Sequence, residues 1–207
     1  MNKKGTVLIS LGIAVIIVGI SLMGYNIYDA KRAEDTADEA YLQMSSHLAD
    51  VEREIDSYTK HEDVEFVPDY VLWPDMEMPV AKIDGRDYVG VLQIPALSLD
   101  LPILSECTSR LLRIAPCRYE GSAYKDGFII AAHNYRSHFS KLKNLYPGDE
   151  IIFRDNAGNV FNYKVVLQET LEPTDVEEMQ SGGWALTLFT CTPGGQYRVT
   201  VRCESAD

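Results

Sequence analysis

An uncharged apolar run at residues 6–23, TVLISLGIAVIIVGISLM, constrains this chain more than any other feature. It approaches the roughly 20 apolar residues with which a helix crosses the hydrocarbon core of a bilayer. Lys3 and Lys4 precede the run, and the residues after it soon turn acidic, with Glu34, Asp35, Asp38 and Glu39. Because cytoplasmic flanks carry the excess of positive charge, we expect a cytoplasmic N-terminus at residues 1–5. A single-pass plasma-membrane anchor is predicted at residues 6–25, with the remainder extracellular.

A cleaved signal peptide is the competing interpretation of the same run. The apolar core of a signal peptide usually spans only about 7–15 residues and ends at a small-x-small cleavage site. The residues after Met23 are GYNIYDAKRA, which contain no clear site of that kind. We therefore favour an uncleaved anchor.

The charge balance excludes one large class of function. The chain carries 19 Lys and Arg against 31 Asp and Glu, a formal net charge of −12. A nucleic-acid binder needs a basic face to neutralise phosphates, so no nucleic-acid partner is expected. Docking onto anionic lipid through a polybasic surface is disfavoured for the same reason.

Between the anchor and residue 88 we expect a helix followed by a linker, together spanning residues 26–87. Prolines and acids at residues 61–87 indicate the linker. The helix has one narrow apolar seam, because its apolar residues are spaced alternately by four and three. Such a seam needs a partner, either the rest of its own chain, which we favour, or a second copy. The seam comprises Ala37, Tyr41, Met44, Leu48, Val51, Ile55 and Tyr58.

From residue 88 onward the pattern changes to short β-rich runs separated by turns. The expected strands are VGVLQI, LPIL, GFIIAA, EIIFRD, VFNYKVVLQ, ALTLFT and YRVTVRC. The DNAGN sequence at residues 155–159 has the turn residues of a hairpin. So many short strands within one domain predict a mostly β, closed or nearly closed barrel at residues 88–207, with a short helix or turn at residues 137–145.

The four cysteines do not form a metal or redox motif. Cys107, Cys117, Cys191 and Cys203 are irregularly spaced and include no CxxC pair, which argues against a zinc knuckle or a thioredoxin-type site. A Cys107–Cys117 disulfide and buried free thiols both remain open.

Three residues at predicted strand ends could act together. Cys191 ends the run TLFTC before a TPGG turn, and His133 follows the strand GFIIAA. If the strands flanking the TPGG turn pair, Arg198 returns beside Cys191. A thiol, a proton-shuttling imidazole and a guanidinium are the groups needed for covalent acyl transfer.

These residues also carry a family resemblance. TLFTC followed by Arg198 resembles the sortase signature TLxTC…R, and the AHN segment resembles the region of the sortase histidine. YVGVLQIPALSLDLPIL at residues 88–104 and FSKLKNLYPGDEIIF at residues 139–153 are similar to the opening and the middle of the sortase core. The resemblance covers about residues 88–203.

The resemblance implies a closed eight-stranded β-barrel and a cysteine transpeptidase, a thiol peptidase of the hydrolase class. Cys191 would attack the Thr–Gly carbonyl of an LPxTG-like sorting signal and form a thioacyl enzyme. His133 would protonate the leaving amine and later accept a proton from the incoming one, and Arg198 would hold the oxyanion. Thr190 would contribute to substrate binding at the cleft floor, whereas His138 is expected at the surface or lining the cleft, without a role in proton transfer.

The implied partners are proteins with a C-terminal LPxTG-like signal and an amine acceptor. The acceptor would be a cell-wall precursor or a pilin of a Gram-positive bacterium. The chemistry requires no cofactor. Some sortases use calcium on an acidic loop, but no such site can be assigned in this sequence.

Departures from the family pattern leave the sortase class and the housekeeping or pilus role open. The stretch between Gln168 and Thr187 is too short for the helical insertion of class B, and no apolar run follows Cys203 as in many class C enzymes. Trp73-Pro74-Asp75 resembles a class C lid in reversed order. A membrane-tethered peptidase that only hydrolyses remains an alternative, as does a non-catalytic β-barrel binding module with Cys191 buried.

Overall fold

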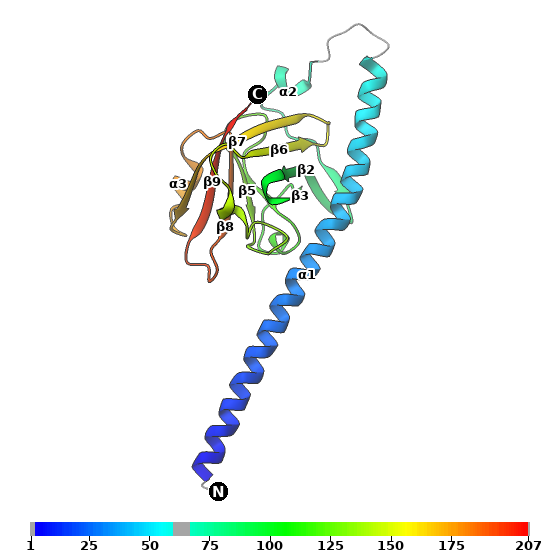
Figure 1. The fold of residues 1–207 in the computed structure, drawn as a ribbon. Coiled ribbons are helices and arrows are strands. Elements are labelled where there is room, and N and C mark those ends of the chain that lie inside the picture. Colours follow the sequence, from blue (N-terminus) through cyan, green and yellow to red (C-terminus); the bar gives the residue numbers. More distant parts are fainter. Residues whose placement is uncertain (1–2, 60–66, 207) are drawn as a thin grey trace.

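The computed structural model describes residues 3–59 and 67–206 of the chain. One long helix, α1 (Lys3–Thr59), lies along a barrel of short strands, and its N-terminal part projects far beyond the barrel (Figure 1). Within the described residues, only α1 is long and apolar enough to cross a membrane, judged by length and composition. Its most apolar 18-residue window has a mean hydropathy of 2.6 and no buried residue.

Eight strands form a closed ring. Their hydrogen-bonded order is β2-β3-β4-β5-β8-β9-β7-β6, and β6 pairs back onto β2. The pairs β3–β4 and β5–β8 are parallel, and the other pairs are antiparallel. Strand β1 forms a hairpin with β2 outside the ring. The predicted closed eight-stranded barrel is therefore confirmed.

The bounds of the elements are close to those predicted from residue 88 onward. The strands are β1 (Ala81–Ile83), β2 (Arg86–Ile94), β3 (Leu99–Leu104), β4 (Cys117–Glu120), β5 (Phe128–Ala132), β6 (Glu150–Asp155), β7 (Val160–Leu171), β8 (Leu186–Cys191) and β9 (Arg198–Ser205). The short helices are α2 (Asp69–Leu72), α3 (Val176–Gln180) and the 3-10 turns η1 (Pro95–Leu97), η2 (Leu111–Arg113) and η3 (Leu142–Asn144).

Gly90 allows the ring to close. It pairs with Asp155 across the β2–β6 seam. A Cβ atom at this position would lie 2.2 Å from the carbonyl oxygen of Arg154 and 2.7 Å from the ring of Phe153. Because no side chain fits between the two strands at this point, the pairing of β2 with β6 requires glycine at position 90.

Alternate side chains of the strands fill the barrel. Phe128 and Ile130 of β5, Leu188 of β8 and Phe153 of β6 are fully buried in one cluster. The rings of Phe128 and Phe153 meet edge to face, with centroids 5.0 Å apart. Each such side chain contributes about 1.5–3 kcal/mol by leaving water, so this interior supplies the main hydrophobic stabilisation of the domain.

The apolar seam of α1 packs against its own barrel, as we favoured. Ala37, Ala40, Met44 and Leu48 are buried in a second cluster with residues of β1, β2 and β3. The helix begins at Lys3 and continues to Thr59. The apolar run and the seam are therefore parts of one continuous rod, with no break at residue 25.

Two short strands were missed by the sequence analysis. β1 falls within the segment predicted to be a linker, and β4 has the sequence CRYE, in which no alternation of apolar residues is visible. The part of the predicted linker at residues 60–66 lies outside the described residues. Both strands exist because neighbouring strands supply their hydrogen-bond partners, which is a tertiary effect.

Candidate active site

The strand register brings three of the predicted residues to one end of the barrel. β5 and β8 run parallel, with Ala132 opposite Thr190. His133 follows Ala132 and Cys191 follows Thr190, so these two residues come together at the same end of the barrel. β8 and β9 run antiparallel, with Cys191 directly opposite Arg198.

The three side chains also share the outer face of the barrel wall. Phe128, Ile130 and Ala132 of β5 belong to the interior cluster, so His133 continues the outer set. Leu186 and Leu188 of β8 point inward, as do Val199 and Val201 of β9, which leaves Cys191 and Arg198 on the outside by the alternation of strands. All three residues are partly buried.

The turn between β8 and β9 orients Arg198. The amide of Thr192 donates to the carbonyl oxygen of Tyr197 at 2.9 Å, and Gly194 and Gly195 have φ values of 89° and 75°, in the region that favours glycine. Nη1 of Arg198 donates to the carbonyl oxygens of Gly195 and Tyr197, both at 3.3 Å. Among the described residues no carboxylate pairs with this guanidinium, so its charge is available to an incoming anion.

Thr190 joins the two strands that carry His133 and Cys191. Its side chain is buried, and its hydroxyl donates to the carbonyl oxygen of Ala132 at 2.8 Å. This hydrogen bond fixes the end of β8 against the end of β5, immediately before both candidate residues. The substrate contact expected for Thr190 stays a prediction.

The environment of His133 favours its neutral form. Burial lowers the pKa of this imidazole, and the positive charge of Arg113 lowers it further, whereas the negative charge of Asp29 acts in the opposite direction. A neutral imidazole can accept a proton from a thiol, which is the first requirement of a general base.

Tyr135 connects the histidine loop to helix α1. Its hydroxyl donates to Oδ2 of Asp29 at 2.6 Å, and its ring centroid lies 5.0 Å from that of His133. Burial and the hydrogen bond to Asp29 raise the pKa of Tyr135 to about 12. This pair was not predictable from the sequence, because the two residues are 106 positions apart and no local spacing connects them.

Together these groups suit acyl transfer through a cysteine. A thiol lies at the same strand ends as an imidazole that can take its proton and a guanidinium that can stabilise a negatively charged oxygen. Covalent catalysis by cysteine needs these components.

Comparison with known proteins identifies the family. The Sortase domain model matches residues 92–206, more than half of the chain. Sortase A of Bacillus anthracis is 31% identical over 199 residues, which cover 92% of this chain and 89% of that protein. The chain belongs to the sortase family.

Solved sortase structures have the same fold. A Sortase D5 transpeptidase of Clostridium perfringens superposes with a TM-score of 0.54 at 20% identity, over 67% of this chain and 88% of that chain. Sortase C of Clostridium perfringens SM101 superposes with a TM-score of 0.53 at 21% identity, over 84% of this chain and 99% of that chain. These likenesses confirm the sortase-like barrel.

His138 differs from its predicted location. It is fully buried rather than at the surface or lining the cleft, and neither ring nitrogen has a hydrogen-bond partner among the described residues. Burial lowers the pKa of His138 to about 4, with a smaller contribution from His133. The sequence could not reveal this, because a turn in the chain around Tyr135 directs the SHF segment back into the barrel end.

A buried arginine, also missed, supports the outer face behind Cys191. Arg202 of β9 is 2% exposed and donates to Oε1 of Glu169 at 2.7 Å and to Oγ1 of Thr187 at 3.2 Å. It also donates to the carbonyl oxygens of Glu178 and Met179, each at 2.7 Å. These hydrogen bonds hold α3 against the outer face of β8 and β9.

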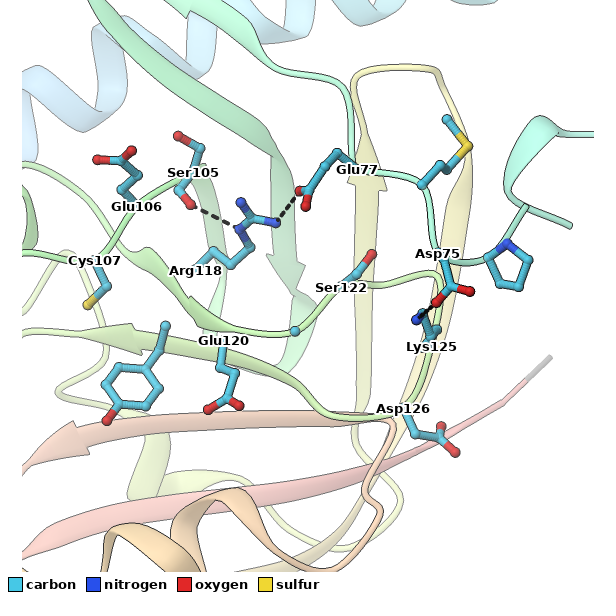
Figure 2. A pocket seen from close by; sticks show the side chains of 14 residues that line it. Asp75, Glu77, Ser105, Glu106, Cys107, Arg118, Glu120, Ser122, Lys125 and Asp126 are labelled. Atoms are coloured by element: carbon cyan, nitrogen blue, oxygen red, sulfur yellow. Dashed lines mark hydrogen bonds and ion pairs between the residues drawn. The ribbon is translucent and has the colours of Figure 1, made fainter. Parts of the chain in front are cut away.

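The Trp73-Pro74-Asp75 segment lies away from the three site residues. Asp75 forms an ion pair with Lys125, and both residues line a cavity of about 550 Å³ (Figure 2). Lys125 precedes β5, whereas His133 follows it, so the contact between Asp75 and Lys125 lies at the opposite end of that strand from His133. Trp73 itself is 61% exposed. The segment therefore does not cover Cys191 in this structure.

The four cysteines are free thiols in the structure. Cys117 and Cys203 are buried, whereas Cys107 is partly exposed. A hydrogen bond with Cys117 lowers the pKa of Cys107. Within residues 3–59 and 67–206, no cluster of three or more His, Cys, Asp or Glu side chains could hold a metal ion.

Proposed function

We propose that this sortase cleaves an LPxTG-like sorting signal and transfers the cleaved protein to an amine acceptor. The observation that carries the proposal is the meeting of three groups at one barrel end: Cys191 faces Arg198 across β8–β9, and His133 follows the residue opposite Thr190. The match to the sortase family model and the 31% identity to a Sortase A support the same reaction.

In the first half of the reaction, Sγ of Cys191 attacks the carbonyl carbon of the scissile Thr–Gly bond. The imidazole of His133 accepts the thiol proton, and Arg198 stabilises the oxyanion. The tetrahedral intermediate then collapses with breakage of the C–N bond, and His133 protonates the leaving amine. A thioester to Cys191 remains, which divides one difficult transfer into two easier steps.

In the second half, an amine attacks the thioester. His133 takes the proton that the amine loses, Arg198 again stabilises the oxyanion, and the thiolate of Cys191 leaves. The acceptor is an amine of a cell-wall precursor or a pilin. Sortase structures from pilus systems, such as the Streptococcus pneumoniae Sortase C studied for its pilin substrate specificity, fold in the same way.

The proposed cellular location is the plasma membrane, with residues 6–25 as a single-pass anchor and the barrel outside. Residues 7–28 are exposed and make no part of the core, as expected of a helix whose partner is lipid. The orientation of the barrel supports this location: Asp29 contacts the histidine loop, whereas Val51 and Ile55 lie near Gly158 at the far end. From Asp29 to Val51 the helix rises about 33 Å, so the active end is the end nearer the membrane.

The full chain in a neutral detergent tests the proposed reaction. It is incubated with peptides of LPxTG type, with and without a small amine, and its intact mass is measured. We expect an acyl adduct on Cys191 that is lost in Cys191→Ala, together with a peptide–amine product. An adduct that yields only free acid would instead indicate a hydrolytic peptidase.

An alkylating probe separates the remaining outcomes when no adduct forms. Labelling of Cys191 would show a reactive thiol and an unsuitable peptide, whereas a silent Cys191 would support the non-catalytic module. Cys107 is partly exposed and its pKa is lowered, so it is a second target for the probe. Cys107→Ser is therefore the background in which Cys191 should be scored.

A further inference from the structure

Four arginines from three separate elements line one cavity of about 510 Å³. They are Arg32 of α1, Arg86 at the start of β2, Arg110 immediately before η2 and Arg113 at the end of η2. The hydroxyl-bearing residues Thr36 and Ser109 complete the polar lining, and no acidic residue belongs to it. We call this cavity the arginine pocket. Its composition stands out in a chain whose net charge is −12.

The positive charge of the arginine pocket is mostly uncompensated. Nη2 of Arg32 forms an ion pair with Oδ1 of Asp29 at 2.9 Å, but Asp29 also accepts the hydrogen bond of Tyr135. Across the part of the chain that the structure describes, Arg86, Arg110 and Arg113 form no salt bridge with a carboxylate. Converging like charges repel one another unless an anion enters, so the pocket is suited to one.

The chemistry of the lining favours a phosphate group. Guanidinium groups bind phosphate oxygens through paired hydrogen bonds and stay charged at every relevant pH. The hydroxyls of Thr36 and Ser109 can donate to further oxygens. The volume of about 510 Å³ exceeds that of a single phosphate and leaves space for the group to which it is attached.

The position of the arginine pocket relates it to both the membrane and the active site. Arg32 follows Met23, the last residue of the apolar run, by nine residues, or about 14 Å along the helix. The headgroup layer extends about 5–8 Å beyond the hydrocarbon core, and an arginine side chain can bridge much of the difference. On its other side the pocket adjoins the catalytic end, because the charge of Arg113 acts on His133.

We propose that Arg32, Arg86, Arg110 and Arg113 form a binding site for a phosphate-bearing anion presented beside the active site. This inference rests on the proposed membrane-anchored function for its setting, which favours a phosphate attached to a lipid. Occupation of the site would offset part of this positive charge and hold the active end of the barrel against the membrane surface.

Native mass spectrometry of the full chain, released from a neutral detergent, tests the inference. Three probes are titrated separately: dihexanoyl phosphatidylglycerol, dihexanoyl phosphatidylcholine and inorganic diphosphate. We compare the wild type with the double variant Arg110→Gln/Arg113→Gln, whose two side chains are exposed and belong to neither hydrophobic cluster. The control Arg53→Gln/Lys143→Gln removes the same charge from exposed residues elsewhere.

We expect phosphatidylglycerol or diphosphate to bind the wild type and the control, and the double variant to bind at least about tenfold more weakly. Stronger binding of phosphatidylglycerol than of phosphatidylcholine and diphosphate would assign the phosphate to a lipid headgroup. Binding of diphosphate alone would assign it to a soluble source. Equal binding by the double variant, or no binding of either phosphate probe to the wild type, would overturn the inference.

Peptide transfer to a soluble amine, measured on the same wild-type sample, separates this inference from the proposed function. Peptide transfer without phosphate binding would contradict only the proposed phosphate site and would leave the proposed function standing. Phosphate binding by a chain whose Cys191 forms no adduct and is silent to the alkylating probe would leave the arginine pocket in place and contradict the transpeptidase.

Discussion

The hydroxyl of Tyr135 donates a 2.6 Å hydrogen bond to Oδ2 of Asp29, and this contact ties the loop after β5 to helix α1. Asp29 is 8% exposed although it lies on the helix that leads to the proposed anchor. The ring of Tyr135 packs near those of both His133 and His138, at centroid distances of 5.0 and 5.4 Å. Tyr135 therefore contacts both helix α1, through Asp29, and the ring of His133.

Tyr135→Phe should lower kcat more than it raises KM. A hydrogen bond to a charged partner contributes about 1.5–3 kcal/mol, and its loss frees the loop that carries His133. Small misplacements of a reacting group cost up to about 100-fold in rate, and we expect about tenfold here. Steady-state kinetics of peptide transfer measure the effect, with the exposed Tyr146→Phe as the matched control. Equal kinetics for both variants would show that the contact has no role in positioning His133.

Two truncations test the same contact from the side of the helix. Removal of residues 1–25 leaves Asp29 in place and deletes no residue of either hydrophobic cluster, and residues 7–25 are all exposed, so we expect a soluble and active enzyme. Removal of residues 1–31 also yields a soluble chain but deletes Asp29, and its activity should fall to the level of Tyr135→Phe. A folded but inactive 26–207 chain would contradict the separation of anchor and catalytic domain.

The pKa of His133 should move in opposite directions in two variants. Arg113 lowers this pKa and Asp29 raises it, so Arg113→Gln should raise it and Asp29→Asn should lower it. NMR titration of labelled histidine in the 26–207 chain measures both shifts. Because Arg113 is exposed, its effect should shrink at 1 M salt, where the Debye length is about 3 Å. Shifts in the same direction would contradict this electrostatic account.

His133→Ala and Arg198→Ala should each abolish turnover and leave the fold intact. Both side chains are partly buried at the barrel end and belong to neither hydrophobic cluster. We expect losses of at least about 100-fold, typical of a lost general acid–base or of a lost donor to an oxyanion. Thermal unfolding and peptide transfer are measured on the same samples. Activity retained by either variant would remove that residue from the mechanism.

The sequence predicted the barrel and the three strand-end residues because both depend on local signals. Cys191 and Arg198 flank a short turn, so pairing of two adjacent strands brings them together. His133 was recognised through the AHN segment rather than through spacing. Strand β4 and the Tyr135–Asp29 contact were not predictable, because they exist only through partners distant in sequence.

Buried polar residues were the other failure of prediction, for a related reason. The segment SHFSK around His138 contains polar neighbours that indicate a surface, whereas Arg202 lies in the predicted strand YRVTVRC, where alternation gives no sign of a partner. Both side chains are buried by elements that return from elsewhere. Arg202 is compensated by carbonyl oxygens of α3, and no periodicity reveals a carbonyl partner. The arginine pocket was missed likewise, because its four arginines come from three segments that are distant in sequence.

Acid should destabilise the fold through His138. Its pKa is about 4 in the folded chain, below the usual 6.5, so the unfolded chain binds an additional proton between these values. Stability is therefore fully present above about pH 6.5 and is lost as the pH falls to about 4, by about 3 kcal/mol. His138→Leu should flatten this dependence, measured by denaturant unfolding across pH, with the exposed His47→Gln as control. An unchanged slope in His138→Leu would assign the acid sensitivity to other groups.

Arg202→Met should be among the most destabilising single changes in the wall of the barrel. The variant loses the bonds to two carbonyl oxygens of α3 and leaves Glu169 without its cation. Removal of one partner of a buried ion pair costs about 3–5 kcal/mol, and the value here should lie near the lower limit because the Glu169 side chain is 26% exposed.

A double variant separates the charge from the packing. Because a buried pair can often be replaced by apolar residues at little cost, Arg202→Met/Glu169→Leu should recover part of the stability lost in Arg202→Met. The carbonyl oxygens of Glu178 and Met179 would still lack donors, so α3 should stay loosened on the strands that carry Cys191 and Arg198. We therefore expect peptide transfer to be lowered in both Arg202→Met and the double variant. Denaturant unfolding and transfer kinetics on the same variants measure the two effects. Full recovery of both would show that Arg202 holds only Glu169, whereas recovery of neither would place its whole contribution in the contact with α3.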